Sequence, residues 1–293
     1  MRSFFTKRVI TVLLVSVALG SVLLLFVLWN SVTPESAVVE PGLGPERSVI
    51  GLSVEGREIE AYTYGNGKEH LAFIGGIHGG YEWNSVLLAY TFMDYLDAHP
   101  EVISQNLTVT VIPSANPDGL YKIVGKEGRF TEAHVPANKS AVPGRLNAHD
   151  VDLNRNFDCK WKSEGVWREN PVSAGSAPFF EPEAAAIRDF VLENNPASVI
   201  FWHSQANAVY ASECEEGILP ETLMIMNEYA RASGYSAVES FGQYEVTGDA
   251  EGWLASIGIP AITVELKTHE TIEWEENLAG IKALFEYYES KVE

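Results

Sequence analysis

Short apolar runs alternate with longer segments of helical periodicity along most of this chain. The runs are rich in β-branched residues and are bounded by turn residues, whereas the segments between them repeat apolar residues every three to four positions. The pattern predicts strands over 48–54, 58–64, 69–74, 107–112, 197–202 and 261–266, and helices over 85–96, 183–192, 221–232, 250–257 and 272–288. Such alternation favours one α/β domain with a mixed, largely parallel sheet flanked by helices.

The stretch from Ser114 to Pro182 breaks this alternation. It is mostly irregular and rich in Asn, Gly, Pro and charge, and a loop region of that length inside a domain is usually functional. In open α/β sheets, ligands bind beyond the carboxyl ends of the strands. His78 and His203 each follow a predicted strand, and Glu265 lies late in a third. We therefore expect these three residues near one crevice.

The first residues differ from the rest. No charge occurs from Val9 to Trp29, which is enough helix to cross about 30 Å of hydrocarbon, and basic residues precede this run. This predicts a membrane anchor over 1–30, a Pro- and Gly-containing linker over 31–47, and a catalytic domain over 48–293 outside the cytoplasm. A cleaved signal peptide shares the basic start and is the competing interpretation; the domain would then be secreted.

Net charge indicates which ligands the protein can bind, and the cysteine content raises the question of a disulfide. The formal net charge of −20 disfavours nucleic acid and anionic lipid surfaces and favours cationic ligands. Cys159 and Cys214 lie in the exported part, where they either form a disulfide or remain two buried thiols. Nothing in the sequence indicates the oligomeric state.

The crevice residues suggest metal chemistry. His78 lies at a strand end, and Glu82 follows four residues later, so both can face one cation; His203 adds a third ligand. Three protein ligands with an open position are typical of one catalytic zinc ion. Glu265 stands in an otherwise apolar strand, where a carboxylate is costly unless it is paired or used. It is therefore a candidate general base, the alternative being a structural ion pair.

Two arginines of the irregular region, Arg145 and Arg155, could bind a carboxylate or a developing oxyanion. Together these motifs resemble those of the zinc metallocarboxypeptidases of the carboxypeptidase A/B family over about 48–290. The resemblance implies that Asn154 and Arg155, in Asp-Leu-Asn-Arg-Asn-Phe, hold the terminal carboxylate of a substrate. It also implies that Arg145 stabilises the oxyanion, that Tyr244 closes on the substrate, and that Glu265 is the catalytic glutamate.

Three departures from the family pattern point to a bacterial branch that includes murein peptide amidases. Three residues rather than two separate His78 from Glu82, His149-Asp150 precedes Val-Asp-Leu-Asn-Arg where a glycine is common, and Gln205 replaces an aromatic residue. The resemblance places Glu251 at the floor of the side-chain pocket, which implies a basic or diamino C-terminal residue in a peptide or cell-wall peptide. Asp249 and Glu251 could equally be solvated loop acids.

Three alternative functions remain. An N-acyl amino acid deacylase resembling aspartoacylase or succinylglutamate desuccinylase shares the zinc core. An inactive module that binds peptides is disfavoured by the complete set of ligands and Glu265. A purely structural zinc site would normally have four protein ligands.

Overall fold

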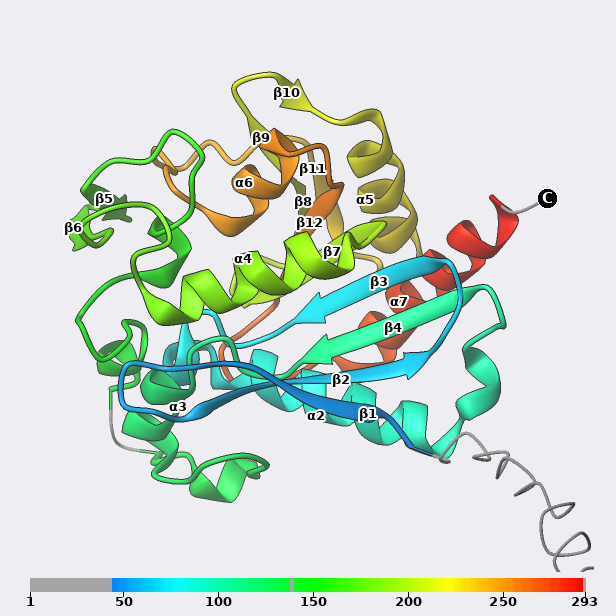
Figure 1. Ribbon diagram of the computed structural model, residues 1–293, viewed down its shortest axis with the longest axis horizontal. Coiled ribbons are helices and arrows are strands. Elements are labelled where there is room, and N and C mark those ends of the chain that lie inside the picture. The colour runs from blue at the N-terminus through cyan, green and yellow to red at the C-terminus, as the bar shows by residue number, and fades with distance from the viewer. Residues whose placement is uncertain (1–43, 138–139, 292–293) are drawn as a thin grey trace, which may run out of the picture. The chain divides into compact units, whose positions relative to one another are not determined.

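A mixed sheet with the strand order β1-β2-β4-β3-β7-β12-β8-β11 forms the centre of the described part of the chain (Figure 1). The computed structural model describes residues 44–137 and 140–291. Neighbouring strands are parallel within β4-β3-β7-β12 and in the β8-β11 pair, and antiparallel at the other contacts. The strands are β1 Glu46–Leu52, β2 Glu58–Gly65, β3 Glu69–Ile74, β4 Leu107–Ile112, β7 Ser198–Ser204, β8 Ala208–Ala211, β11 Ser236–Val238 and β12 Ala261–Leu266.

Alternating side chains of the central strands build a core on each face of the sheet. On β3, Leu71 and Phe73 contribute to one core, while Ala72 and Ile74 contribute to the other. The first core is covered by α2 (Trp83–Ala98), α5 (Pro220–Ser233) and α7 (Trp274–Ser290). The second is covered by α4 (Pro182–Asn194) and α6 (Ala250–Ser256), and Figure 1 shows α4 in front of the sheet with α2 and α7 behind it. Burial on both faces explains why the central strands are almost continuously apolar.

The strand and helix predictions in the regular part of the chain are confirmed. The helices begin and end with familiar signals: α4 and α5 start at a proline, and α5 ends at Gly234, whose φ of 75° is left-handed. The short strands β8 and β11 were not predicted. Each has only three or four residues, which is too few to show a period.

The prediction that the stretch from Ser114 to Pro182 is mostly irregular is confirmed, although the stretch also contains short elements that were not predicted. It contains α3 (Pro117–Val124), whose N-terminus is capped by the Asn116 side chain, and a hairpin of β5 (Glu164–Trp167) and β6 (Asn170–Ser173). Asn-Pro-Asp-Gly resembles a turn, yet Asn at the cap and Pro at the first position are also how helices begin. The remaining short elements are the 3-10 helices η1 Gly79–Glu82, η2 Pro100–Val102, η3 Glu132–His134, η4 Val142–Gly144 and η5 Leu153–Arg155, and the strands β9 Glu213–Cys214 and β10 Gly217–Ile218.

The predicted anchor and most of the predicted linker lie outside the described residues. Within 44–137 and 140–291, no helix combines the length and the apolar character that crossing a bilayer requires. The anchor therefore stays a prediction.

Candidate active site

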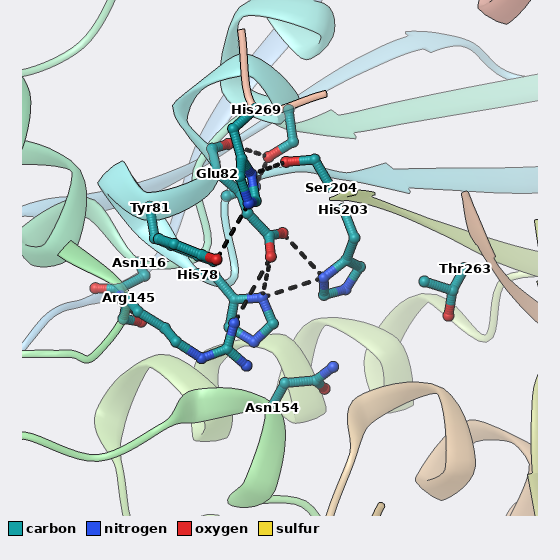
Figure 2. A network of polar contacts seen from close by, with 12 residues as sticks. His78, Tyr81, Glu82, Asn116, Arg145, Asn154, His203, Ser204, Thr263 and His269 are labelled. Atoms are coloured by element: carbon teal, nitrogen blue, oxygen red, sulfur yellow. Dashed lines mark hydrogen bonds and ion pairs between the residues drawn. The ribbon is translucent and has the colours of Figure 1, made fainter. Parts of the chain in front are cut away.

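His78, Glu82 and His203 come together at the carboxyl ends of β3 and β7 (Figure 2). The Glu82 carboxylate lies 2.8 Å from His78 Nδ1 and 3.1 Å from His203 Nδ1, and the two Nδ1 atoms are 3.2 Å apart. All three side chains are buried. Burial alone would raise the pKa of Glu82, but the charges of His78 and His203 hold that pKa well below its usual value. Two imidazole nitrogens and a carboxylate aimed at one point are a donor set that suits zinc.

A second carboxylate lies behind each histidine. His78 Nε2 is 3.3 Å from Asp152 Oδ1, and His203 Nε2 is 3.2 Å from Glu251 Oε1. Such outer carboxylates fix the tautomer and the orientation of a ligating imidazole. The sequence analysis did not predict this role for Asp152 or Glu251. No local spacing could reveal it, because each contact joins distant segments.

Backbone contacts between glycines position the His78 loop. We call Gly79, Gly80, Gly119 and Gly144 the glycine junction; it joins η1 to the start of α3 and to η4. Gly79 has a left-handed φ of 45°, and a Cβ at Gly119 would lie 2.4 Å from the carbonyl oxygen of Gly144. Only glycine fits such close approach. The junction lets η1 turn tightly enough for Glu82 to return to His78 despite the three-residue spacing.

Glu265 lies beside His203 because their strands pair in register. In the parallel pair β7 and β12, Glu265 is opposite His203, and Thr263 is opposite Phe201. Burial, followed by the negative charge of Glu82, raises the pKa of Glu265 to about 7. Its Oε2 atom is buried without a hydrogen-bond partner in the described part of the chain. This carboxylate is therefore close to the ligand group and free to exchange a proton.

Arg145 and Arg155, the two arginines proposed to bind anions, have different partners. Arg145 donates from Nε and Nη2 to Asp152 Oδ2 at 3.1 and 2.9 Å, and its Nη1 is 3.7 Å from Glu82. Arg155 donates to the carbonyl oxygens of Asn154 and Val166 instead. Among the described residues no carboxylate pairs with Arg155, although it is buried. Arg155 is therefore a fixed cation available to an anionic ligand.

A cavity of about 220 Å³ opens next to the ligand group. Arg145, Asn154 and Arg155 line one part of it, together with His78, His203 and Glu265. Tyr244 also lines the cavity, and its ring packs against Phe241 at 4.8 Å between centroids. The cavity thus collects the predicted ligands, the predicted base and the predicted carboxylate-binding residues.

The inner wall of the cavity is acidic. Glu251 is buried there, and its Oε1 atom accepts a hydrogen bond from Thr263 at 2.9 Å as well as approaching His203. Asp249 caps α6 by accepting from the Gly252 N–H at 2.7 Å; burial and then the charge of Glu251 raise the pKa of Asp249 to about 6. The alternative that these two residues are solvated loop acids is therefore wrong.

A disulfide joins Cys159 to Cys214 at the edge of this cavity, with the Cα atoms 6.1 Å apart. Cys159 itself lines the cavity, and Ser212 and Glu213, just before Cys214, do so too. The Cys159 carbonyl accepts from the Gly248 N–H at 2.7 Å. The disulfide therefore connects two walls of the cavity. The wall at Cys159 contacts the segment of Tyr244, and the wall at Cys214 follows β8.

With this geometry in place, comparison with known proteins defines the class. Residues 45–274 match the family model of the zinc carboxypeptidases, so the chain belongs to this family of peptide-bond hydrolases, which use one zinc ion. The fold agrees: bovine thrombin-activatable fibrinolysis inhibitor superposes with a TM-score of 0.68 at 19% identity, over 85% of this chain and 91% of that one.

Two of the relatives that the chain matches are bacterial proteins. The chain is 28% identical over 242 residues to a gamma-D-glutamyl-L-diamino acid endopeptidase 1 of Lysinibacillus sphaericus, covering 74% of this chain and 59% of that protein. It is 30% identical over 131 residues to murein peptide amidase A of Escherichia coli K12, covering 41% and 50%. The chain thus spans about a quarter to three fifths of the length of the first curated relatives it matches.

Proposed function

We propose that this enzyme hydrolyses the amide bond that precedes a C-terminal residue with an amine-bearing side chain, such as lysine or diaminopimelate, in peptides of the cell wall. One observation carries the proposal. Glu265 stands in register with His203 at a cavity with buried acids on one wall. Another wall carries Arg155, which pairs with no carboxylate of the described residues.

The binding of the C-terminal residue follows from the cavity wall. Arg155 and the Asn154 side chain would hold its carboxylate, since the guanidinium has no carboxylate partner of its own in the described part of the chain. The side-chain ammonium would point toward Glu251 and Asp249. Glu251 already has one oxygen engaged by Thr263 and His203, so the ammonium would share this carboxylate rather than neutralise it alone.

The chemical step follows from the positions of Glu265 and Arg145. A zinc ion bound by His78, Glu82 and His203 would polarise the scissile carbonyl group and lower the pKa of a water molecule. Glu265 would accept a proton from the attacking water and give it to the leaving amine. Arg145, held rigidly by Asp152, would donate to the carbonyl oxygen as negative charge develops on it.

Tyr244 would close the cavity over the bound residue. Its ring already lines the cavity, and burial raises its pKa, so the hydroxyl stays protonated and can donate a hydrogen bond.

The proposal includes a place for the enzyme. We infer that the catalytic domain works outside the cytoplasm, anchored by the predicted apolar segment at 9–29. The Cys159–Cys214 disulfide supports this, because such bonds persist in oxidising compartments. The names of the two bacterial relatives also support a cell-wall substrate. When a protease is added to intact cells whose outer layers have been removed, it should digest the domain. Full protection of the domain would contradict the inference.

The experiment compares substrates on the zinc-loaded protein. Peptides that end in lysine, diaminopimelate or phenylalanine are incubated with the wild type and with Glu251→Gln, alongside acetyl-aspartate and succinyl-glutamate. We expect release of the basic residues and loss of the preference for lysine over phenylalanine in Glu251→Gln. An unchanged preference would refute the role of Glu251. Hydrolysis of the acyl amino acids alone would favour the deacylase.

A further inference from the structure

A second arginine without a carboxylate partner among the described residues lies on the β5–β6 hairpin. Trp167 and Asn170 pair at the end of this hairpin, which leaves Arg168 and Glu169 as its turn. Arg168 has a φ of 57°. A left-handed residue is normal in so tight a turn. The turn presents an exposed guanidinium next to the edge of the active site.

Arginines in the described part of the chain fall into two groups. In a protein with a net charge of −20, most of them form an ion pair with a carboxylate. The paired ones are Arg47, Arg57, Arg129, Arg145, Arg188 and Arg231. Arg155 and Arg168 have no such pair within 44–137 and 140–291. Since Arg155 is the proposed site for one substrate carboxylate, Arg168 is a candidate for another.

Aromatic contacts hold Arg168 in place. Its Cζ atom lies 5.2 Å from the centroid of the Trp167 ring, and its Nη2 atom donates to the Tyr81 hydroxyl at 3.5 Å. Arg145 packs on the same indole, with its Cζ 4.5 Å from the ring. The two guanidiniums therefore share Trp167, and Arg145 in turn reaches Glu82 of the ligand group.

Tyr81 connects the surface formed by Trp167 and Arg168 to the ligand group. It lies between His78 and Glu82 in the sequence and is buried, and its hydroxyl is 3.1 Å from His269 Nε2. The other nitrogen of His269 is 2.7 Å from the Ser204 hydroxyl. Figure 2 shows Tyr81 on one side of the ligand group and Thr263, which lines the cavity, on the opposite side.

The position of this surface assigns it to the other half of the substrate. The C-terminal residue would occupy the cavity, and Arg145, which lines the cavity, packs on Trp167, so the acyl part of the peptide would extend over this indole. We propose that Arg168 binds a carboxylate on the residue that supplies the scissile carbonyl, and so selects an acidic residue there. This inference rests on the proposed function and adds the acyl half of the substrate to it.

A γ-linked glutamyl residue has the required chemistry. Its α-carboxylate is free, and four single bonds of about 1.5 Å join the scissile carbonyl carbon to the carboxylate carbon. The Cζ atoms of Arg145 and Arg168 lie 4.5 and 5.2 Å from the centroid of Trp167, so the two guanidiniums are close enough for one residue to contact both. A guanidinium stacked on an aromatic ring and bonded to a hydroxyl is pre-organised for a carboxylate, which it can bind through two parallel hydrogen bonds.

The test measures binding and does not depend on turnover. In the Glu265→Gln background, calorimetry compares alanyl-γ-D-glutamyl-lysine with the same tripeptide whose glutamyl α-carboxylate is an amide. We expect the carboxylate form to bind about tenfold more tightly. The additional change Arg168→Gln removes this difference, whereas the control Arg231→Gln, at an exposed arginine on α5, retains it.

Equal binding of the two tripeptides, or a difference that survives Arg168→Gln, overturns the inference. Turnover by the wild type is measured separately. If the wild type fails to cleave both tripeptides and the peptides of the previous section, the proposed function fails, while the binding result still decides the role of Arg168. Raising the salt concentration should weaken the preference, because the site is exposed.

Discussion

Removing the Cys159–Cys214 cross-link should lower the stability of the domain by a predictable amount. The two cysteines are 55 residues apart in the sequence. Closing a loop of that length in the unfolded chain costs about 4 kcal/mol of conformational entropy at 25 °C. A domain of this size has an unfolding free energy of about 5–15 kcal/mol. The disulfide is thus a large share of the total.

The corresponding shift in melting temperature is about 8–16 °C, since each kcal/mol moves Tm by about 2–4 °C in a domain of this size. The perturbation is the double substitution Cys159→Ala and Cys214→Ala, which avoids placing a hydroxyl at two buried positions. Differential scanning calorimetry is run with and without a phosphine reductant at saturating zinc. The reductant should lower Tm of the wild type only.

The same change should affect substrate binding more than chemistry, because Cys159 lines the cavity and its carbonyl holds Gly248 near the Tyr244 segment. We expect KM for the C-terminal residue to rise and kcat to change less. The reasoning is refuted if Tm of the double variant lies within about 2 °C of the oxidised wild type. Two free thiols in the unreduced, denatured wild type would refute it directly.

Three further predictions concern the chemistry of the site. Glu265→Gln should lower kcat by about 10²–10⁴ with an unchanged zinc content by elemental analysis, whereas near wild-type activity would exclude this base. Glu265 must be ionised to act. Its pKa is about 7 without a metal ion and falls when a cation binds beside it, so kcat/KM should decline as the pH decreases below 7. A flat profile from pH 8 to 4 would contradict this. Asp152→Asn should weaken zinc binding about 10–100-fold in a chelator competition, whereas Asp189→Asn, at an exposed surface pair, should not; equal affinities would show that Asp152 does not orient His78.

The elements that the sequence predicts well are those long enough to show a period. The strand that precedes His78 and the strands that carry His203 and Glu265 are apolar runs between turn residues. Their order alone places these residues at one end of the sheet. The hairpin carrying Trp167 was missed, because its strands have four residues each and most of these residues are exposed.

Contacts between distant segments limit how much of the candidate site the sequence can predict. The spacing of His78 and Glu82 predicts that they share a cation, but it cannot predict that Asp152 or Glu251 lies behind a histidine. Glu251 was expected as a residue of the side-chain pocket alone. Its contact with His203 depends on how α6 packs against β12, which no local pattern specifies.

The glycine junction couples three segments of the chain so that none of them can shift without the others. Where side chains separate two loops, a change on one can be absorbed by repacking the other. Here main-chain atoms of the His78 loop, the start of α3 and the loop before Arg145 are in direct contact, so little side-chain repacking can absorb a change. An engineer who wished to move this metal site into another scaffold would have to transplant all three loops together.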